Sequence, residues 1–470
     1  MDPLRKARRV FIVGIKGVAM ANIAIILKQM GLNVSGVDTE ETFITDELLE
    51  KNKISFIENF SKAALPTDCD LILYSAAHGG SANHLVVIAK KNNVSTLSQA
   101  EFVGALMKYF KTKIAVTGCH GKTTTSSLLA HSLIKLEARP SYLVGAPYFD
   151  QYEGGDYQGK NYFVVEADEY AVDPPRDKTP KFNFMNPDIA ICTNIDYDHP
   201  DVYESLSETK AAFVKFLKGK HVILCQDDQN LKSISRLLNQ SKKETYGFSN
   251  ESDLHVTNYR PLKTGSRFTL KHRNKVLGNY SVNLYGQKNV LNAAAVVLTL
   301  ISLGFAAKDI KEAIRGFYGA KRRFEQLLHE NDIYLFDDYG HHPQEIRATI
   351  QAAKDRFPDR RVIIIFQPHT YSRTKSMLVE FASSLSEASL SIVLPVFSSA
   401  REQAQTDIVK SEDVSISAKA LKKTNVVAVN SKKEALQLLK EYLDKKDVIF
   451  TMGAGDVYKL KDDIISLIRK

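Results

Sequence analysis

Residues 113–133 read KIAVTGCHGKTTTSSLLAHSL. The apolar run Lys113–Val116 predicts a strand, and the periodic apolar positions from Leu128 onward predict a helix. Between them lies the pattern G-x-x-G-K-T, whose glycines let backbone N–H groups converge on phosphate oxygens. We expect Lys122 to neutralise the terminal phosphates of a nucleotide and the Thr123 hydroxyl to bind Mg²⁺. The segment therefore predicts a phosphate-binding loop within an α/β fold.

Carboxylates follow two further apolar strands downstream of this loop. Tyr162–Val165 leads into Glu166, and Ile189–Thr193 leads into a segment that contains His199. In a parallel sheet, ligands gather at the carboxyl ends of the strands. Glu166 is therefore a candidate Mg²⁺ ligand. His199 is a second candidate, although Mg²⁺ prefers oxygen, and a purely structural role for this histidine stays open at this point.

A second nucleotide-type unit opens the chain. Val10–Val13 predicts a strand, the turn Gly14–Gly17 and a helical pattern follow, and the next strand ends at Asp38. This order places a diphosphate at a helix N-terminus. The dinucleotide fingerprint GxGxxG is not met, because Lys16 and Ala19 occupy its second and third glycine positions. The unit indicates a nucleotide diphosphate rather than NAD, with a simple tight turn as the alternative.

The last third of the chain also alternates strands and helices, which predicts a mostly parallel sheet. Strands are predicted at Ile333–Phe336, Arg361–Phe366, Ile392–Val396 and Val448–Thr451, with a helix at Gln344–Phe357. Polar loops follow these strands at residues 337–343, 367–374 and 453–456. Such loops are the expected place for chemistry, although ordinary turns would look the same. Taken together, the three units suggest a reaction that joins ATP to a second nucleotide-like substrate.

Length and composition agree with a protein of several globular domains. At 470 residues the chain predicts about three domains. We place them at residues 1–110, 111–318 and 319–470. Hydrophobic residues make up 44% and charged residues 25%, as in ordinary globular proteins. No apolar run approaches 18 residues, so we expect no membrane insertion.

Charge and cysteine usage exclude other classes. The net charge of +9 comes from basic residues that alternate with acidic ones, and no basic block interleaves with aromatics, so we expect no nucleic-acid partner. The 4 cysteines are widely spread without a CxxC pair, which indicates reduced thiols. The N-terminal apolar run lacks the features of a signal peptide. We expect a cytoplasmic protein that is a monomer or weak homodimer.

Eight short motifs occur together in this chain, in the order TGCHGKTTT, EADEY, NIDYDH, GQKNVLN, AKRRFE, DDYGHHPQEI, FQPHTYSRT and TMGAGD. This set resembles the Mur ligase family, and the resemblance runs from about Phe11 to Gly455. It implies a Rossmann-like N-terminal domain that holds a UDP moiety, a central P-loop domain that binds ATP, and a Rossmann-like C-terminal domain that brings in an amino acid.

The resemblance also implies a reaction. The lactyl carboxylate of UDP-N-acetylmuramate takes the γ-phosphoryl group of ATP, and the amine of L-alanine attacks the acyl phosphate, giving an amide, ADP and phosphate in peptidoglycan precursor synthesis. The alternative within the family is the murein-recycling ligase, which attaches a tripeptide to the same substrate. A nucleotide-gated regulatory protein without turnover and an NAD-linked dehydrogenase are disfavoured, because the phosphate loop and the later motifs are intact.

Residue roles follow from the resemblance position by position. Catalytic roles are implied for Lys122, Glu166, His199, His342 and Arg373. ATP contacts are implied for Gly118, Cys119, His120, Gly121, Lys122, Thr123, Thr124, Asn289, Asn292, Arg323 and Asp338. Contacts to the other substrates are implied for Gly14, Lys16, Gly17, Asp38, Ser75, His120, His369 and Arg373. Mg²⁺ ligands are implied to be Thr123, Glu166 and His199.

The sequence departs from the family pattern at a few positions. Lys16 and Ala19 replace glycines of the first loop, and Lys288 stands where relatives usually carry His. Thr370 stands where relatives commonly carry a basic residue. The segment Ala171–Lys178 is longer and more polar than is typical, as in the recycling relative.

Overall fold

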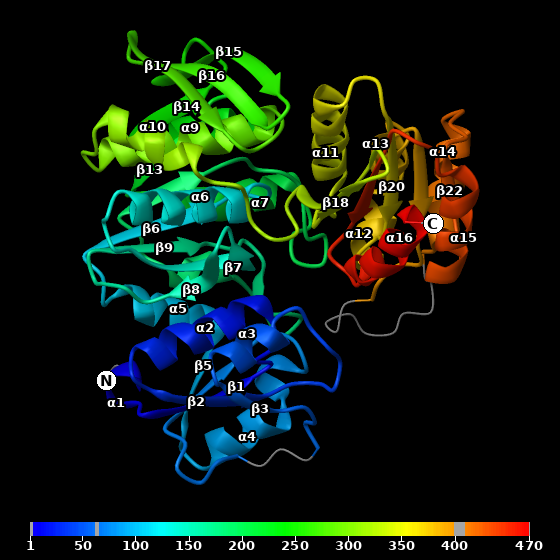
Figure 1. Cartoon of the computed structure of the whole chain (residues 1–470). Coiled ribbons are helices and arrows are strands. Elements are labelled where there is room, and N and C mark those ends of the chain that lie inside the picture. The colour runs from blue at the N-terminus through cyan, green and yellow to red at the C-terminus, as the bar shows by residue number, and fades with distance from the viewer. Residues whose placement is uncertain (1–2, 62–64, 399–408, 470) are drawn as a thin grey trace.

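The computed structural model describes residues 3–61, 65–398 and 409–469. Three large sheets follow one another along the chain, and each is flanked by helices (Figure 1). We call the parts built on them the N-terminal module (residues 3–107), the central module (residues 112–315) and the C-terminal module (residues 325–468). The predicted α/β class is confirmed. Within the described residues, none of the helices combines the length and apolar character that a bilayer crossing requires.

The N-terminal module is a five-stranded parallel sheet. Across the sheet its strands are β3 (Ser55–Ile57), β2 (Asn33–Val37), β1 (Arg9–Val13), β4 (Leu71–Tyr74) and β5 (Ser95–Ser98). Its helices are α1 (Pro3–Lys6), α2 (Val18–Gln29), α3 (Asp46–Lys51), η1 (Gly80–Ala82), α4 (His84–Lys91) and α5 (Gln99–Met107). The apolar run Val10–Val13 forms the central strand, as predicted.

The central module is a ten-stranded mixed sheet. In spatial order its strands are β17 (Lys275–Val282), β16 (Gly265–His272), β15 (Leu254–Leu262), β14 (Lys242–Gly247), β13 (His221–Cys225), β12 (Ile189–Cys192), β6 (Thr112–Thr117), β9 (Tyr162–Glu166), β7 (Ser141–Phe149) and β8 (Tyr152–Asp156). Helical segments are α6 (Lys122–Lys135), η2 (Lys181–Phe184), α7 (Leu206–Leu217), α8 (Gln229–Ile234), η3 (Ser235–Leu237), α9 (Gln287–Ser302) and α10 (Ala307–Arg315). A separate hairpin consists of β10 (Ala171–Asp173) and β11 (Asp177–Pro180).

The C-terminal module is a six-stranded sheet in which only β18 is antiparallel to its neighbour. Its strands are β18 (Glu325–Glu330), β19 (Ile333–Asp338), β23 (Asp447–Met452), β20 (Arg361–Phe366), β21 (Leu390–Val393) and β22 (Val426–Ala428). Its helices are α11 (Pro343–Arg356), α12 (Tyr371–Ser376), α13 (Leu378–Leu385), α14 (Ser411–Ala420), α15 (Lys432–Tyr442), η4 (Val457–Leu460) and α16 (Lys461–Ile468).

One predicted strand has different bounds. The pattern predicted Ile392–Val396, but β21 is Leu390–Val393. Its pairing with β20 ends at the Phe366–Val393 pair. Pro395 lies two residues further on and has no N–H to donate to a ladder, so the apolar residues around it continue as a loop.

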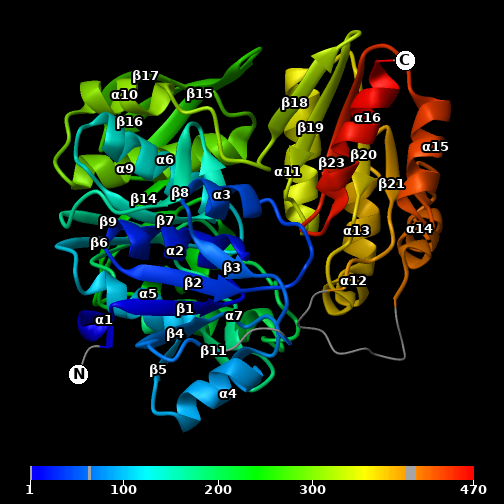
Figure 2. The same ribbon diagram turned by 60° about the horizontal axis from the view of Figure 1, so that its bottom comes forward.

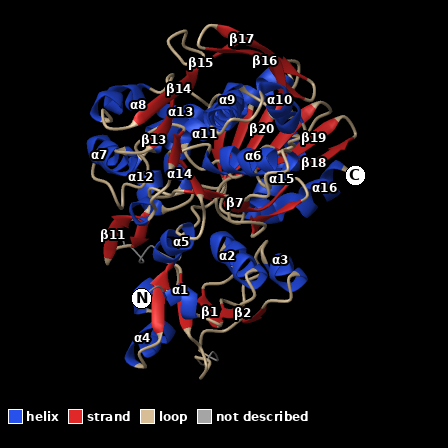
Figure 3. Ribbon diagram, turned by 90° about the vertical axis from the view of Figure 1, so that its left-hand side faces the viewer, coloured by secondary structure: helices blue, strands red, loops and turns tan. Residues whose placement is uncertain are grey.

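The N-terminal and central modules share one hydrophobic core. A single cluster of buried side chains runs from Ile12 in the first sheet, through Ile23 of α2, to Val116 and Val164 in the second sheet. Helix α2 lies between the two sheets (Figures 1 and 3). The C-terminal module instead has cores of its own on the two faces of its sheet, and Figure 2 shows it standing beside the other two modules. The first two modules therefore form one packed unit.

A buried amide fastens α2 to the central module. The Asn22 side chain is fully buried, and its Nδ2 donates to the carbonyl oxygens of Val144 and Ala146, each at 3.0 Å. The approach is so close that a Cβ on Gly155 would lie 2.4 Å from the Asn22 carbonyl oxygen. Glycine is therefore required at this contact.

Candidate active site

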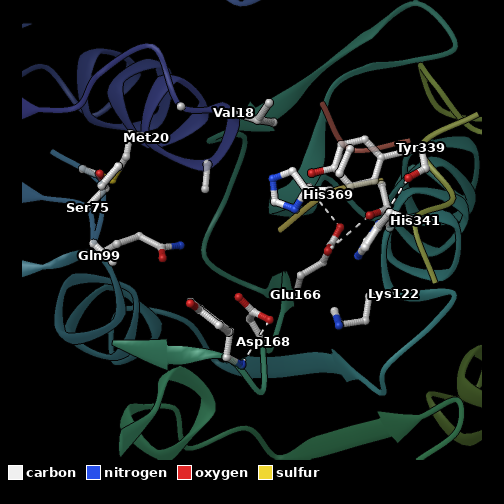
Figure 4. Close-up of a pocket in the computed structure, with 18 of the residues that line it drawn as sticks. Val18, Met20, Ser75, Gln99, Lys122, Glu166, Asp168, Tyr339, His341 and His369 are labelled. Atoms are coloured by element: carbon white, nitrogen blue, oxygen red, sulfur yellow. Dashed lines mark hydrogen bonds between the residues drawn. The ribbon is translucent and has the colours of Figure 1, made fainter. Parts of the chain in front are cut away.

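A cavity of about 940 Å³ opens where the three modules meet (Figure 4). Residues from all three modules line it. Of the residues implied by the sequence, it is lined by Gly14, Gly17, Asp38, Ser75, Cys119, Gly121, Lys122, Thr123, Glu166, His199, Arg323, His369 and Arg373. Those that lie outside its lining are Lys16, Gly118, His120, Thr124, Asn289, Asn292, Asp338 and His342.

The phosphate loop joins β6 to α6, and its glycines are required sterically. Gly118 and Gly121 have φ of 124° and 84°, a region that L side chains rarely adopt. A Cβ on Gly118 would lie 2.2 Å from the Thr193 hydroxyl oxygen, and one on Gly121 would lie 2.7 Å from Asn292 Oδ1. The loop is therefore held tightly against β12 and α9, with its backbone shaped around the start of α6.

Lys122 is the first residue of α6 and is held by a carboxylate that the sequence reasoning did not select. Its Nζ lies 2.8 Å from Glu169 Oε2 and 2.7 Å from the Gly118 carbonyl oxygen. Burial by itself lowers the pKa of Lys122, but the charges of Glu169 and Asp168 raise it above its ordinary value. The ammonium is therefore charged at the position where nucleotide phosphates are expected.

Glu166 and Thr123 lie together, as predicted from their positions at a strand end and a helix start. The Thr123 hydroxyl donates to Glu166 Oε2 at 3.3 Å and accepts from Arg323 Nη2 at 3.2 Å. Burial raises the pKa of Glu166, partly offset by the Gly145 N–H. A hydroxyl and a carboxylate at the mouth of a phosphate loop fit a Mg²⁺ ion, which prefers oxygen ligands.

A second oxygen-rich group surrounds His199. The Nε2 atom of His199 lies 3.6 Å from Glu169 Oε1. Together with Asp168 these residues form a set whose ligand atoms lie within 4.8 Å of one another. Lys181 Nζ donates to Asp168 Oδ2 at 2.8 Å. The sequence reasoning placed His199 near the metal but missed Asp168 and Glu169. The three acids of EADEY were the available signal, since Glu166 ends β9, which runs parallel to the strand before the phosphate loop, and the other two acids follow it.

Arg373 reaches the central module from α12. Its Nε donates to Asp198 Oδ1 at 2.8 Å, and both side chains are buried. Its Nη2 lies 3.4 Å from His199 Nδ1. Burial by itself raises the pKa of Asp198, but the Arg373 charge brings it well below its ordinary value. The ion pair joins the central and C-terminal modules. Nη1 donates to the His369 carbonyl oxygen at 3.3 Å, and Arg373 is among the residues that line the cavity.

The structure separates the two histidines of DDYGHHP. His342 is the N-cap of α11, its Nδ1 accepts the Gln344 N–H at 3.3 Å, and its ring packs 4.5 Å from that of His120. His341 lines the cavity instead. Burial and the nearby Arg373 lower the pKa of His341 to about 3, so this ring is neutral. His342, for which the resemblance implies a catalytic role, therefore lies outside the cavity lining, because capping the helix turns its ring toward His120.

Lys16 likewise points away from the cavity. Its Nζ lies 2.6 Å from Glu58 Oε1 and 3.3 Å from Asp46 Oδ2, and the side chain is fully buried. Its ammonium is therefore used internally and not on a substrate. Its backbone N–H still donates to Asp38 Oδ2 at 2.7 Å, which orients that carboxylate at the cavity wall.

The other wall of this end of the cavity is the loop that follows β4. A Cβ on Gly14 would lie 2.6 Å from the Ser75 hydroxyl oxygen, so the first loop and this one are in direct contact. His78 Nε2 lies 3.2 Å from Asp38 Oδ1. The β10–β11 hairpin supports the loop: the Ser81 N–H donates to Asp173 Oδ2 at 3.1 Å, and Arg176 pairs with the same carboxylate at 2.9 Å.

At the far end, the two asparagines of GQKNVLN lie behind the phosphate loop. Asn292 Nδ2 donates to Asn289 Oδ1 at 3.1 Å. Asp338 accepts the Phe324 and Gly340 N–H groups at 2.8 and 2.7 Å. Burial raises the pKa of Asp338 to about 6, and the Arg323 charge partly offsets this. These residues stand close to the cavity without lining it.

Sequence comparison agrees with this architecture. Three family models match in series: "Mur ligase family, catalytic domain" at residues 9–111, "Mur ligase middle domain" at 116–300, and "Mur ligase, glutamate ligase domain" at 322–455. The chain belongs to the Mur ligase family.

Individual relatives carry a more specific name. The UDP-N-acetylmuramate–L-alanine ligase of Lactobacillus johnsonii is 35% identical over 461 residues, with 98% of each chain covered. That of Streptococcus equi subsp. zooepidemicus is 35% identical over 450 residues, covering 95% of this chain and 94% of its own. The crystal structure of the UDP-N-acetylmuramate-alanine ligase of Thermotoga maritima superposes with a TM-score of 0.79 at 26% identity, covering 98% of this chain and 99% of that one.

Proposed function

We propose that this protein is an ATP-dependent ligase that joins the lactyl carboxylate of UDP-N-acetylmuramate to L-alanine in peptidoglycan precursor synthesis. The observation that carries the proposal is one cavity shared by the three modules. Lys122 and Glu166 line it from the central module and Arg373 from the C-terminal module. The loop of the N-terminal module that contains Gly14 and Gly17 lines its other end. The relatives named above support the same substrates. Its four cysteines are free, in keeping with a cytoplasmic location.

The proposed domain roles follow the three modules. Residues 1–110 hold the UDP-linked substrate, residues 111–318 hold ATP, and residues 319–470 bring L-alanine to the cavity. Gly14, Gly17, Asp38 and Ser75 line the end assigned to the UDP-linked substrate. Asn289, Asn292 and Asp338 are assigned to the nucleoside of ATP.

The first chemical step brings a carboxylate to the γ-phosphate of ATP, and both are anions. Lys122 and Arg323 supply positive charge at this point and stabilise the charge of the transferring phosphoryl group. Mg²⁺ would be held by Thr123 and Glu166, and a second ion by His199 with Asp168 and Glu169. When bound, the ions neutralise phosphate charge.

The second step is attack of the alanine amine on the acyl phosphate, with loss of phosphate. Arg373 binds the α-carboxylate of alanine through its Nη edge, because Asp198 already occupies Nε. Held in this way, the amine is oriented toward the acyl carbon. His341 and His369 line the same part of the cavity, and neutral His341 accepts a hydrogen bond from the amine.

The proposed function is tested by phosphate release from ATP with Mg²⁺ and UDP-N-acetylmuramate. Three reactions are compared: no amine, L-alanine, and the tripeptide L-Ala-γ-D-Glu-meso-diaminopimelate. We expect release only with L-alanine. Release that requires the tripeptide would assign the recycling reaction instead, and the hairpin that contains Ala171–Lys178 would then be part of the amine site.

The contacts of Asp173 with Ser81 and Arg176 predict that a change at Asp173 causes a selective binding defect. Asp173→Asn removes the charge that holds Ser81 and Arg176, so the loop with His78 loses its support. We expect the KM for UDP-N-acetylmuramate to rise about tenfold, the scale of one lost charged hydrogen bond, with the KM for ATP unchanged. Lys178→Ala, on the exposed side of the same hairpin, is the control. A parallel rise in both KM values would contradict the assignment of this loop.

The separate core of the C-terminal module predicts domain motion. Because the first two modules share one core and the third does not, we expect ligands that bridge the modules to change only the position of the third. Small-angle scattering should give a smaller radius of gyration with ATP, Mg²⁺ and UDP-N-acetylmuramate than without ligands. Superimposable profiles in the two conditions would rule this closure out.

A further inference from the structure

A second set of metal-type ligands lies behind the cavity. His120 stands in the phosphate loop, Asp196 follows β12, and His342 begins α11. Their ligand atoms lie within 4.8 Å of one another, and none of the three lines the cavity. Two belong to the central module and one to the C-terminal module, whose helix α11 faces the central sheet (Figure 1). The reaction proposed above does not use this set.

The distances within the set fit a tetrahedral ion. Asp196 Oδ2 lies 3.2 Å from His120 Nε2 and 3.6 Å from His342 Nδ1. Two ligands of a tetrahedral Zn²⁺, each about 2.0–2.1 Å from the metal, lie about 3.3–3.4 Å apart. The two distances from Asp196 Oδ2 therefore differ from the ligand–ligand distance of such a tetrahedron by no more than a few tenths of an ångström.

The surroundings orient the same three atoms. The other ring nitrogen of His120, Nδ1, lies 3.4 Å from Glu345 Oε1, and that of His342, Nε2, lies 3.4 Å from the Tyr197 carbonyl oxygen. Asp196 Oδ1 accepts the Tyr197 N–H at 2.9 Å, which leaves Oδ2 for the ion. Metal-binding histidines typically donate their second N–H to a carboxylate or a carbonyl in this way.

The protonation of the rings is compatible with an exchange of a proton for a metal. His342 Nδ1 accepts the Gln344 N–H at 3.3 Å, a long hydrogen bond on the same lone pair, which a bound ion would replace. His120 Nε2 lies 3.2 Å from Asp196 Oδ2 and Nδ1 lies 3.4 Å from Glu345 Oε1, so a protonated ring links the two carboxylates without a metal. Metal binding at His120 Nε2 releases that proton.

We propose that His120, Asp196 and His342 form a binding site for a divalent transition metal of the Zn²⁺ class. Two imidazoles and one carboxylate suit Zn²⁺, whereas Mg²⁺ prefers oxygen ligands alone. Because His342 comes from the C-terminal module, the bound ion holds that module against the phosphate loop. The site is separate from the Asp168–Glu169–His199 group.

The test uses the full chain after treatment with a chelator, titrated with ZnCl₂ alone in an isothermal calorimeter. We expect one ion per chain, and a visible d–d spectrum of tetrahedral intensity when CoCl₂ replaces it. Asp196→Asn and His342→Gln are each expected to weaken zinc binding by about 100-fold or more. His329→Gln, a histidine outside the set that stacks on Tyr334, is the control and should bind zinc normally.

Two results would overturn the proposal. One is zinc binding that survives Asp196→Asn but is lost in Asp168→Asn, which would assign the ion to the other group. The other is no saturable zinc binding by the unaltered chain. Thermal unfolding of each variant separates a lost ligand from a lost fold, and Asp196→Asn keeps the shape of the side chain. No substrate is present, so the outcome is independent of the proposed ligase activity.

Discussion

Lys122→Ala is expected to lower the turnover number about 10³-fold or more. The variant removes the buried ammonium that meets the anionic phosphoryl group, and loss of one such charge from a preorganised site has effects of this size. The measurement is phosphate release at saturating ATP, UDP-N-acetylmuramate and L-alanine. Lys135→Ala, an exposed lysine at the other end of the same helix, should retain turnover.

The ion pair with Glu169 makes a second variant necessary. Lys122→Ala leaves the Glu169 carboxylate buried without its partner, which costs about 3–5 kcal/mol of folding stability. The double variant with Glu169→Gln removes that penalty and should recover stability. Because Glu169 is also assigned to the second ion, its turnover is compared with that of Glu169→Gln alone and should lie far below it. Turnover that returns together with stability would mean that Lys122 acts only through the fold.

Arg373→Ala is expected to raise the KM for L-alanine by about 100-fold or more while the KM for ATP changes little. Two charged hydrogen bonds to the α-carboxylate are lost, and each contributes about 1.5–3 kcal/mol. Initial rates with each substrate varied in turn give the two values. Arg347→Ala, which loses exposed contacts to Glu387 and Ser383, is the control.

Stability again separates two roles of this residue. Removing Arg373 leaves Asp198 buried and unpaired, so the melting temperature should fall, and Asp198→Asn in the same chain should restore it. If the double variant binds L-alanine normally, the guanidinium only neutralises Asp198. Equal increases in the two KM values of Arg373→Ala would also contradict its assignment to the amino acid.

Much of the fold could be predicted from local patterns. The apolar runs before Gly14 and Gly118 form the strands β1 and β6, since a run of buried residues between turn signals has few alternatives in an α/β chain. The site residues Lys122 and Thr123 were predictable, because their expected role depends on the local turn between β6 and α6. The pattern did not distinguish His341 from His342, because the direction of the His342 ring depends on its capping of α11.

The sequence by itself determined the α/β class, the phosphate loop and the placement of acids at strand ends, because these depend on a few contiguous residues. Only the tertiary structure decided which groups meet. Asp198 pairs with Arg373 across 175 positions, Asp173 supports a loop 92 positions earlier, and Lys16 turns inward to Glu58. Such contacts depend on how separately built sheets pack, and side-chain partners that distant leave no periodic signal in one sequence.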